Sequence, residues 1–164
     1  MKKLVATLMV GIVFTCHVIS VNAAPEAKYV GEVITDQGTS QELTVNPQVS
    51  ILAKRNPTLS YKANLSVSAA AVYGTTLYLS STAKIKNTGA AVRIDKMTIS
   101  GKITGTDKQS KSGSKIGKNT SSLSYQLYTS DYGKGTLKQC SGVHKFENKG
   151  YYAKTLNTKK TYNN

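Results

Sequence analysis

The stretch that decides the fold is TTLYLSSTAKIKN, residues 75–87. One set of alternate positions is apolar or small: Leu77, Leu79, Ser81, Ala83 and Ile85. The intervening positions are polar or aromatic: Tyr78, Ser80, Thr82, Lys84 and Lys86. Because successive side chains of a strand point to opposite faces, this alternation predicts an antiparallel strand with one buried face and one face in water.

A turn and a returning segment follow this strand. Asn87-Thr88-Gly89 is a turn signal, since glycine adopts positive φ without strain. In the return through residues 90–104, the apolar positions change parity between Ile94 and Met97. This change predicts a β-bulge near Asp95-Lys96, where one extra residue restores the common face. Alternatively, the chain passes from one sheet to another at this point.

Further strands are indicated along the chain by the same period of two. They are expected at residues 29–35, at 43–51 with Pro47 in an edge position, at 61–71, at 123–127, and in a closing hairpin of 143–146 with 151–155. Roughly seven to nine short strands separated by turn signals predict an all-β fold, an antiparallel, immunoglobulin-like β-sandwich. A small β-barrel is the alternative. The chain has no Trp and lacks the Cys pair of a true immunoglobulin domain.

Residues 105–122, GTDKQSKSGSKIGKNTSS, lack the alternation of apolar and polar residues that marks the expected strands. Ile116 is the only large apolar residue in the segment, and its one acid is Asp107. Its length and polarity predict a mobile surface loop. The basic tail, residues 154–164, is expected to fray or to add an edge strand.

The first 23 residues have the pattern of a secretory signal peptide. Lys2 and Lys3 precede a mostly apolar run, and Val21-Asn22-Ala23 suits signal peptidase. We therefore expect a signal peptide at 1–23 and a single secreted domain at 24–164. Cleavage would remove two lysines and lower the formal charge from +14 to +12. It would also leave Cys140 and His144 as the only Cys and His.

The residues that catalysis or metal binding requires are scarce. A Ser-His-acid triad would have to use His144, and no Gly-x-Ser-x-Gly motif accompanies it. Cys140 and His144 supply two metal ligands where zinc sites use three or four. The acids are dispersed, so they suggest neither a calcium loop nor a glycosidase pair. We expect no catalytic residues, no metal, no cofactor and no enzymatic activity, with Cys140 as a buried apolar thiol beside a surface His144.

The strongest remaining signal is the positive charge, of which 20 of 22 cations are lysine. Lysine is a hydrated point charge, whereas specific base recognition favours arginine. The sequence therefore predicts a secreted, extracellular, non-enzymatic module that attaches to anionic polymers or membrane surfaces and does not recognise nucleic-acid sequence. The alternative is an antimicrobial or toxin-like protein acting at an anionic membrane. The candidate binding residues are Lys108, Lys111, Lys115, Lys118, Lys134, Lys138, Lys145, Lys149, Tyr151 and Tyr152.

Tyr128 and Tyr132 are expected at the surface with Tyr151 and Tyr152, where a ring and an ammonium together suit glycans or anionic interfaces. We expect a monomer, with a Cys140-linked dimer as the alternative.

Overall fold

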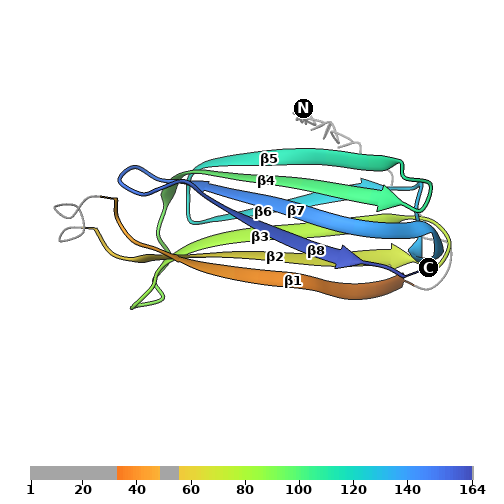
Figure 1. Cartoon of the computed structure of the whole chain (residues 1–164), viewed down its shortest axis with the longest axis horizontal. Coiled ribbons are helices and arrows are strands. Elements are labelled where there is room, and N and C mark those ends of the chain that lie inside the picture. Colours follow the sequence, from red (N-terminus) through yellow and green to blue (C-terminus); the bar gives the residue numbers. More distant parts are fainter. Residues whose placement is uncertain (1–32, 49–55, 164) are drawn as a thin grey trace, which may run out of the picture.

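The computed structural model describes residues 33–48 and 56–163, which form two four-stranded antiparallel sheets packed as a sandwich (Figure 1). The first sheet has the order β1-β2-β3-β6, with strands Val33–Val45, Leu59–Ala70, Thr75–Ile85 and Ser122–Thr129. The second has the order β5-β4-β7-β8, with strands Ser110–Thr120, Ile94–Gly105, Leu137–Glu147 and Lys154–Thr161. A short 3₁₀ turn, Lys134–Thr136, precedes β7. The expected signal peptide, 1–23, lies outside the described residues.

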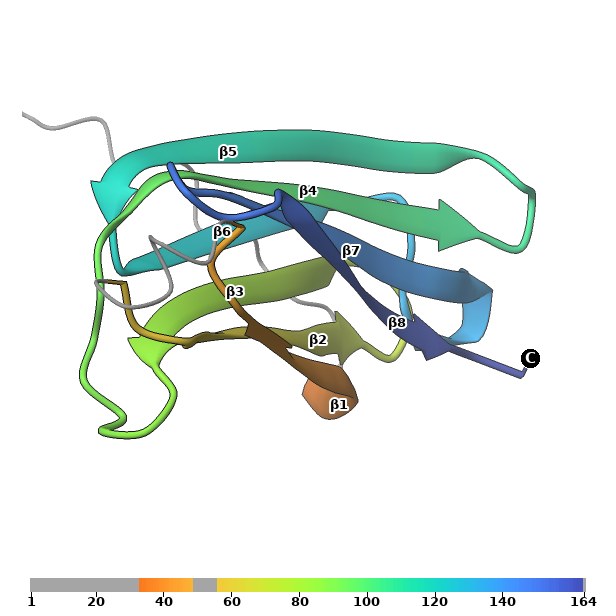
Figure 2. The same ribbon diagram turned by 60° about the vertical axis from the view of Figure 1, so that its left-hand side comes forward.

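The predicted all-β sandwich is confirmed, and the barrel alternative is wrong, because the strands divide into two sheets that do not close on each other (Figure 2). The strand order does not confirm an immunoglobulin-like topology. β1 contains the last residues of the first expected strand and the first residues of the second. Pro47 follows β1 in an isolated bridge to Tyr151, while Val49 and Ile51 lie outside the described residues.

Residues 75–85 form the predicted half-buried strand, β3. Leu77, Leu79 and Ala83 of β3 are buried, whereas Tyr78 and Lys84 are exposed. The inner faces of the two sheets supply one continuous hydrophobic core. Towards one end of the core, the rings of Tyr61 from β2 and Phe146 from β7 stack, with centroids 4.5 Å apart. The hydrophobic effect therefore holds the sheets together, since both contacting faces are apolar.

The predicted bulge at Asp95-Lys96 is wrong, and the alternative of a sheet crossing is confirmed. Ala91 bridges to Lys84 of the first sheet, and β4 then begins at Ile94 in the second sheet. β4 pairs with β5 in constant register from Ile94↔Thr120 to Thr104↔Ser110. The register shift of β4 lies instead at Thr104/Gly105, opposite β7. Ile94 and Met97 are both buried within β4, so the change of parity lies inside this strand, at the unpaired Asp95 and directly after the change of sheet.

The predicted mobile loop at 105–122 is also wrong, because most of it forms the edge strand β5. β5 has no buried side chain and is held by its backbone ladder to β4. An edge strand without buried side chains carries no apolar alternation in its sequence. Its lysines and serines also discourage edge-to-edge pairing with other chains.

The opposite border of the sandwich is joined by hydrogen bonds from backbone to side chain. The Asn157 amide of β8 donates to Gln41 Oε1 of β1 at 2.9 Å, and the Lys159 amide donates to Thr39 Oγ1 at 2.7 Å. The tail therefore forms an edge strand, one of its two expected outcomes. The closing hairpin is confirmed as β7 and β8, with Gly150 at φ 83° in its turn.

Candidate binding faces

The outer face of the second sheet gathers lysines from all four of its strands. Alternation turns Met97, Ile99 and Ile103 of β4 inward, so Lys96 and Lys102 face outward. The same rule applied to the neighbouring strands adds three more cations. We define the lysine face as this outer surface with Lys96, Lys102, Lys118, Lys145 and Lys159.

The strand register sets the spacing of these charges. Lys102 lies opposite Ser141 of β7, which in turn lies opposite Lys159 of β8. Two strand spacings place the Cα atoms of Lys102 and Lys159 about 10 Å apart. Lys96 lies directly opposite Lys118 at the far end of the sheet. The cations are therefore spread over the whole face, as a repeating polyanion would require.

Glu147 is the one acid on the lysine face among the described residues. It forms ion pairs of 3.0 Å with both Lys96 and Lys145. The hydrogen bonds from Lys145 and then Lys96 hold the pKa of the Glu147 carboxyl below its ordinary value. These pairs are partly exposed, so water screens them. The face keeps an excess of four positive charges over its one acid.

The predicted lysines do not all lie together. Lys118 and Lys145 belong to the lysine face, whereas Lys111 and Lys115 occupy the other side of β5. The remaining predicted lysines lie in the β4–β5 turn (Lys108), the 3₁₀ turn (Lys134), the start of β7 (Lys138) and the β7–β8 turn (Lys149). Sequence reasoning missed Lys96, Lys102 and Lys159. The signal for Lys96 and Lys102 was available in β4, where lysines alternate with the buried Met97, Ile99 and Ile103.

The expectation that four tyrosines of the C-terminal third are exposed is wrong for two of them. Tyr151 is 7% exposed, and its hydroxyl donates to the Pro57 carbonyl at 2.6 Å. Tyr132 is equally buried, beside the Asp107 carboxylate. Tyr152 and Tyr128 are exposed, at 61% and 38%. Tyr151 therefore stabilises the fold and does not present its ring to a ligand.

The two groups that looked most reactive in sequence are both enclosed in the core. Cys140 is fully buried, as expected for an apolar thiol, and burial raises its pKa to about 12. His144 is also fully buried, so the expected surface position is wrong. Its Nδ1 lies 2.8 Å from Ser81 Oγ and its Nε2 lies 2.9 Å from Thr158 Oγ1. This chain of hydrogen bonds connects the two sheets, and a substrate has no access to it.

Burial lowers the pKa of His144 to about 4, so the imidazole is neutral at ordinary pH. The described part of the chain contains no group of three His, Cys, Asp or Glu residues that could hold a metal ion. A disulfide from Cys140 to a second chain would require the sandwich to open, because the thiol is enclosed on all sides.

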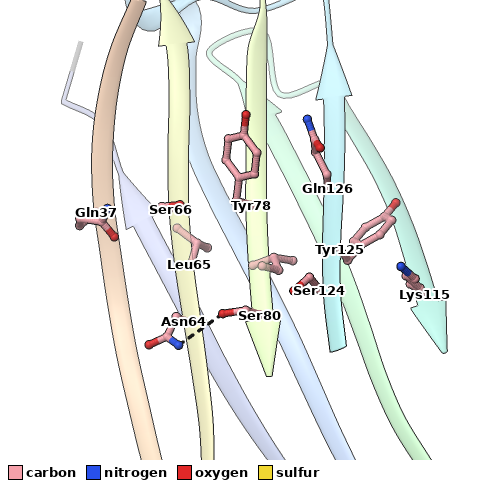
Figure 3. A pocket seen from close by; sticks show the side chains of 11 residues that line it. Gln37, Asn64, Leu65, Ser66, Tyr78, Ser80, Lys115, Ser124, Tyr125 and Gln126 are labelled. Carbon is pink, nitrogen blue, oxygen red and sulfur yellow. Dashed lines mark hydrogen bonds between the residues drawn. The ribbon is translucent and has the colours of Figure 1, made fainter. Parts of the chain in front are cut away.

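The outer face of the first sheet carries a different surface. A hollow of about 610 Å³ lies over β2, β3 and β6, with contributions from β1 and β5 (Figure 3). Its lining combines hydroxyl, amide and phenol groups, including those of Gln37, Asn64, Ser66, Tyr78, Ser80 and Gln126, with Leu65 and Leu79, and apolar atoms supply more of its surface than polar atoms. Among the residues that the structure describes, Lys115 from β5 is the one charged residue that lines it.

Comparison with known proteins gives no relative: no protein-family model, no curated protein and no solved structure matches the chain. No helix within residues 33–48 and 56–163 is long and apolar enough to cross a membrane.

Proposed function

We propose that this protein is a secreted, non-enzymatic binding module that attaches to anionic extracellular polymers through the lysine face. The observation that carries the proposal is the placement of five lysines and one acid on a single sheet face. Such a surface raises the local concentration of polyanions and accelerates their encounter with the protein. The enclosure of His144 and Cys140 supports a role without bond-making.

The chemistry of the face favours diffuse attachment to a chain of repeated charges. Lysine ammonium groups attract anions without fixing their orientation, unlike the planar fork of arginine. Ser100, Ser112 and Ser141 lie between the cations and offer hydroxyl groups to a polymer backbone. The immunoglobulin-like topology stays a prediction and contributes nothing to the proposal, because a fold does not define a function.

The test is elution of the protein from an immobilised polyanion such as heparin in a salt gradient. The triple variant Lys102→Gln, Lys118→Gln, Lys159→Gln should elute at clearly lower salt than the unmodified protein. The matched control is Lys62→Gln, Lys84→Gln, Lys86→Gln, which removes the same charge from the strands and turn of the first sheet. The control should elute close to the unmodified protein.

Equal effects of the two triple variants would show that net charge alone matters, and would contradict a binding face. Retention that persists unchanged at high salt would contradict electrostatic attachment altogether. Vesicles of phosphatidylglycerol with entrapped dye test the membrane alternative. Dye release would favour the toxin-like function, whereas binding without release agrees with the proposal.

A further inference from the structure

We propose that the hollow on the outer face of the first sheet binds a segment of neutral polysaccharide. This goes beyond the attachment of anions to the lysine face, since it assigns a second ligand of different chemistry to the opposite side of the sandwich. The proposal rests on the shape of the hollow, the fixed orientation of its polar groups, its low charge and the exposed aromatic surface of Tyr78.

The shape of the hollow follows from side-chain size along three strands. Ser66, Ser80 and Ser124 are small and leave space above the sheet. Tyr78 and Gln126, which are cross-strand neighbours, rise at one end (Figure 3). Such a shallow hollow is open to solvent along its length, so it suits an extended chain better than a compact small molecule.

Several polar groups in the hollow are already held in place. The Ser40 hydroxyl donates to Asn64 Oδ1 at 2.7 Å, and Asn64 Nδ2 donates to Ser80 Oγ at 3.3 Å, the bond drawn in Figure 3. These bonds fix which end of the Asn64 amide donates and which accepts. Each amide nitrogen carries two hydrogens and each hydroxyl can both donate and accept, so capacity remains for ligand hydroxyls. Preorganised groups of this kind lower the entropy lost on binding.

The charge of the lining selects against anionic ligands. Within the described ranges, Lys115 is the single charged residue at the hollow, and it stands at the border with β5 beside Tyr125 (Figure 3). A nucleic acid or an acidic glycan would place repeated negative charges over serine and amide groups and would bind more strongly to the lysine face. A neutral sugar chain brings hydroxyl groups that match the donors and acceptors of the hollow.

Tyr78 supplies the aromatic surface that sugar rings require. Its side chain is 42% exposed on β3, and no acid lies opposite it on β2 or β6. Tyr128 lies on the same face one row further along, where it is paired with Thr76 and is 38% exposed. Tyr78 lines the hollow and Tyr128 lies just beyond its lining residues, so a sugar chain that extends past the hollow could reach a second ring. A second copy of this chain is a poorer occupant, because self-association would bury uncompensated hydroxyl and amide groups.

The experiment uses the ¹⁵N-labelled protein and neutral hexasaccharides of β-1,4-linked glucose, β-1,4-linked N-acetylglucosamine and α-1,4-linked glucose. Addition of each sugar up to about 10 mM covers the weak affinities expected for one stacked ring and a few hydrogen bonds. At least one hexasaccharide should shift the amide signals of Ser66, Tyr78 and Gln126. Absence of shifts with all three sugars would overturn the proposal, and so would shifts confined to the second sheet.

Variants separate stacking from general surface effects. Tyr78→Ala should weaken binding by about tenfold or more, whereas Tyr78→Phe should keep most of it because the ring remains. The matched control is Tyr152→Ala, which removes an exposed tyrosine near the β7–β8 turn and should have no effect. Equal losses in the Tyr78→Ala and Tyr152→Ala variants would contradict the assignment to this hollow.

Salt and the lysine variants distinguish this proposal from the attachment of polyanions. Binding of a neutral hexasaccharide should be the same at low and high salt and in the variant Lys102→Gln, Lys118→Gln, Lys159→Gln. Retention on heparin should be unchanged in Tyr78→Ala. Sedimentation at the same protein concentrations tests the second copy as occupant, and concentration-dependent dimers that Tyr78→Ala abolishes would overturn the sugar assignment.

Discussion

The two outer faces of the sandwich are built alike and differ in chemistry. Each covers four antiparallel strands, and every strand except the edge strand β5 contributes inner residues to the same core. The second sheet presents five lysines and Glu147, whereas the hollow of the first sheet presents hydroxyl, amide and phenol groups with Lys115 at its border. Packing fixes only every second residue of a strand, so the intervening residues of each sheet are free to specialise. One core can therefore carry two separate binding surfaces.

The largest expected effect comes from breaking the core that both faces share. Replacing Phe146 by Ala removes the stack on Tyr61 and leaves a cavity between the sheets. We expect the free energy of unfolding to fall by about 3–5 kcal/mol, measured by urea denaturation. Binding on both faces should be lost together as the population unfolds. A loss below about 1 kcal/mol would contradict the contribution of this stack to core packing, and Tyr152→Ala is the surface control.

Acid should weaken the connection between the two sheets at His144. In the folded state its pKa is lowered to about 4, while the unfolded chain protonates near the ordinary value of 6.5. The unfolded state therefore binds more protons between these values, so the contribution is complete above pH 6.5 and is lost as the pH falls towards 4. We expect a loss of about 2–3 kcal/mol from this group, measured by urea denaturation at pH 7 and pH 4.5.

The control for the acid effect is His144→Gln, which has no titrating group at this position. Its stability should depend less on pH than that of the unmodified protein, even if its stability at pH 7 is lower. Parallel pH curves for the two proteins would show that other groups cause the acid sensitivity.

A smaller loss of stability is expected from a substitution at the contact between β5 and β6, where the two sheets meet. A Cβ atom at Gly113 of β5 would overlap the hydroxyl of Tyr125, which reaches under this strand from β6. Gly113→Ala should therefore lower the free energy of unfolding by about 1–3 kcal/mol. Adding Tyr125→Phe removes the overlapping oxygen and should recover part of the loss. A strictly additive double variant would contradict this contact.

The smallest effect on stability, and a useful one on binding, is expected from Glu147→Gln. The ion pairs of Glu147 with Lys96 and Lys145 are partly exposed, so the free energy of unfolding should change by less than about 1 kcal/mol. The lysine face would then lack its one acid among the described residues, and elution from heparin should move to higher salt. Unchanged elution would argue that this end of the face does not contact the polyanion, while neutral hexasaccharide binding should remain constant.

Comparison of sequence and structure shows where local patterns suffice. The strand at residues 75–85 was predictable because one of its faces packs on the core and the other meets solvent. β5 was not predictable in the same way, since neither of its faces is buried and its partner β4 supplies its stability through the backbone. The parity change after Ile94 lies inside β4, directly after the chain passes from the first sheet to the second, and only the strand pairing shows this passage.

The candidate binding surfaces likewise combine features visible in the local sequence with features that depend on strand pairing. Single lysines were visible in the sequence, but their grouping on one face depended on the registers of β4 with β5 and β7. Tyr151 and Tyr132 resembled surface tyrosines because polar residues surround them in sequence, and both are buried by distant segments. The hollow combines residues from several strands, including Gln37 and Gln126, which no local pattern associates.

The sequence by itself determined the β class, the alternation of buried and exposed positions in β3, the buried Cys140 and the excess of lysine. The β class, the alternation and the lysine excess follow from composition or from the period of two, and the burial of Cys140 follows from the general preference of free cysteine for apolar surroundings. Only the tertiary structure decided that β5 is a strand, that His144 lies in the core, and that two chemically different faces lie back to back. These depend on strand pairing between distant segments, and pairing is set by the packing of the whole core.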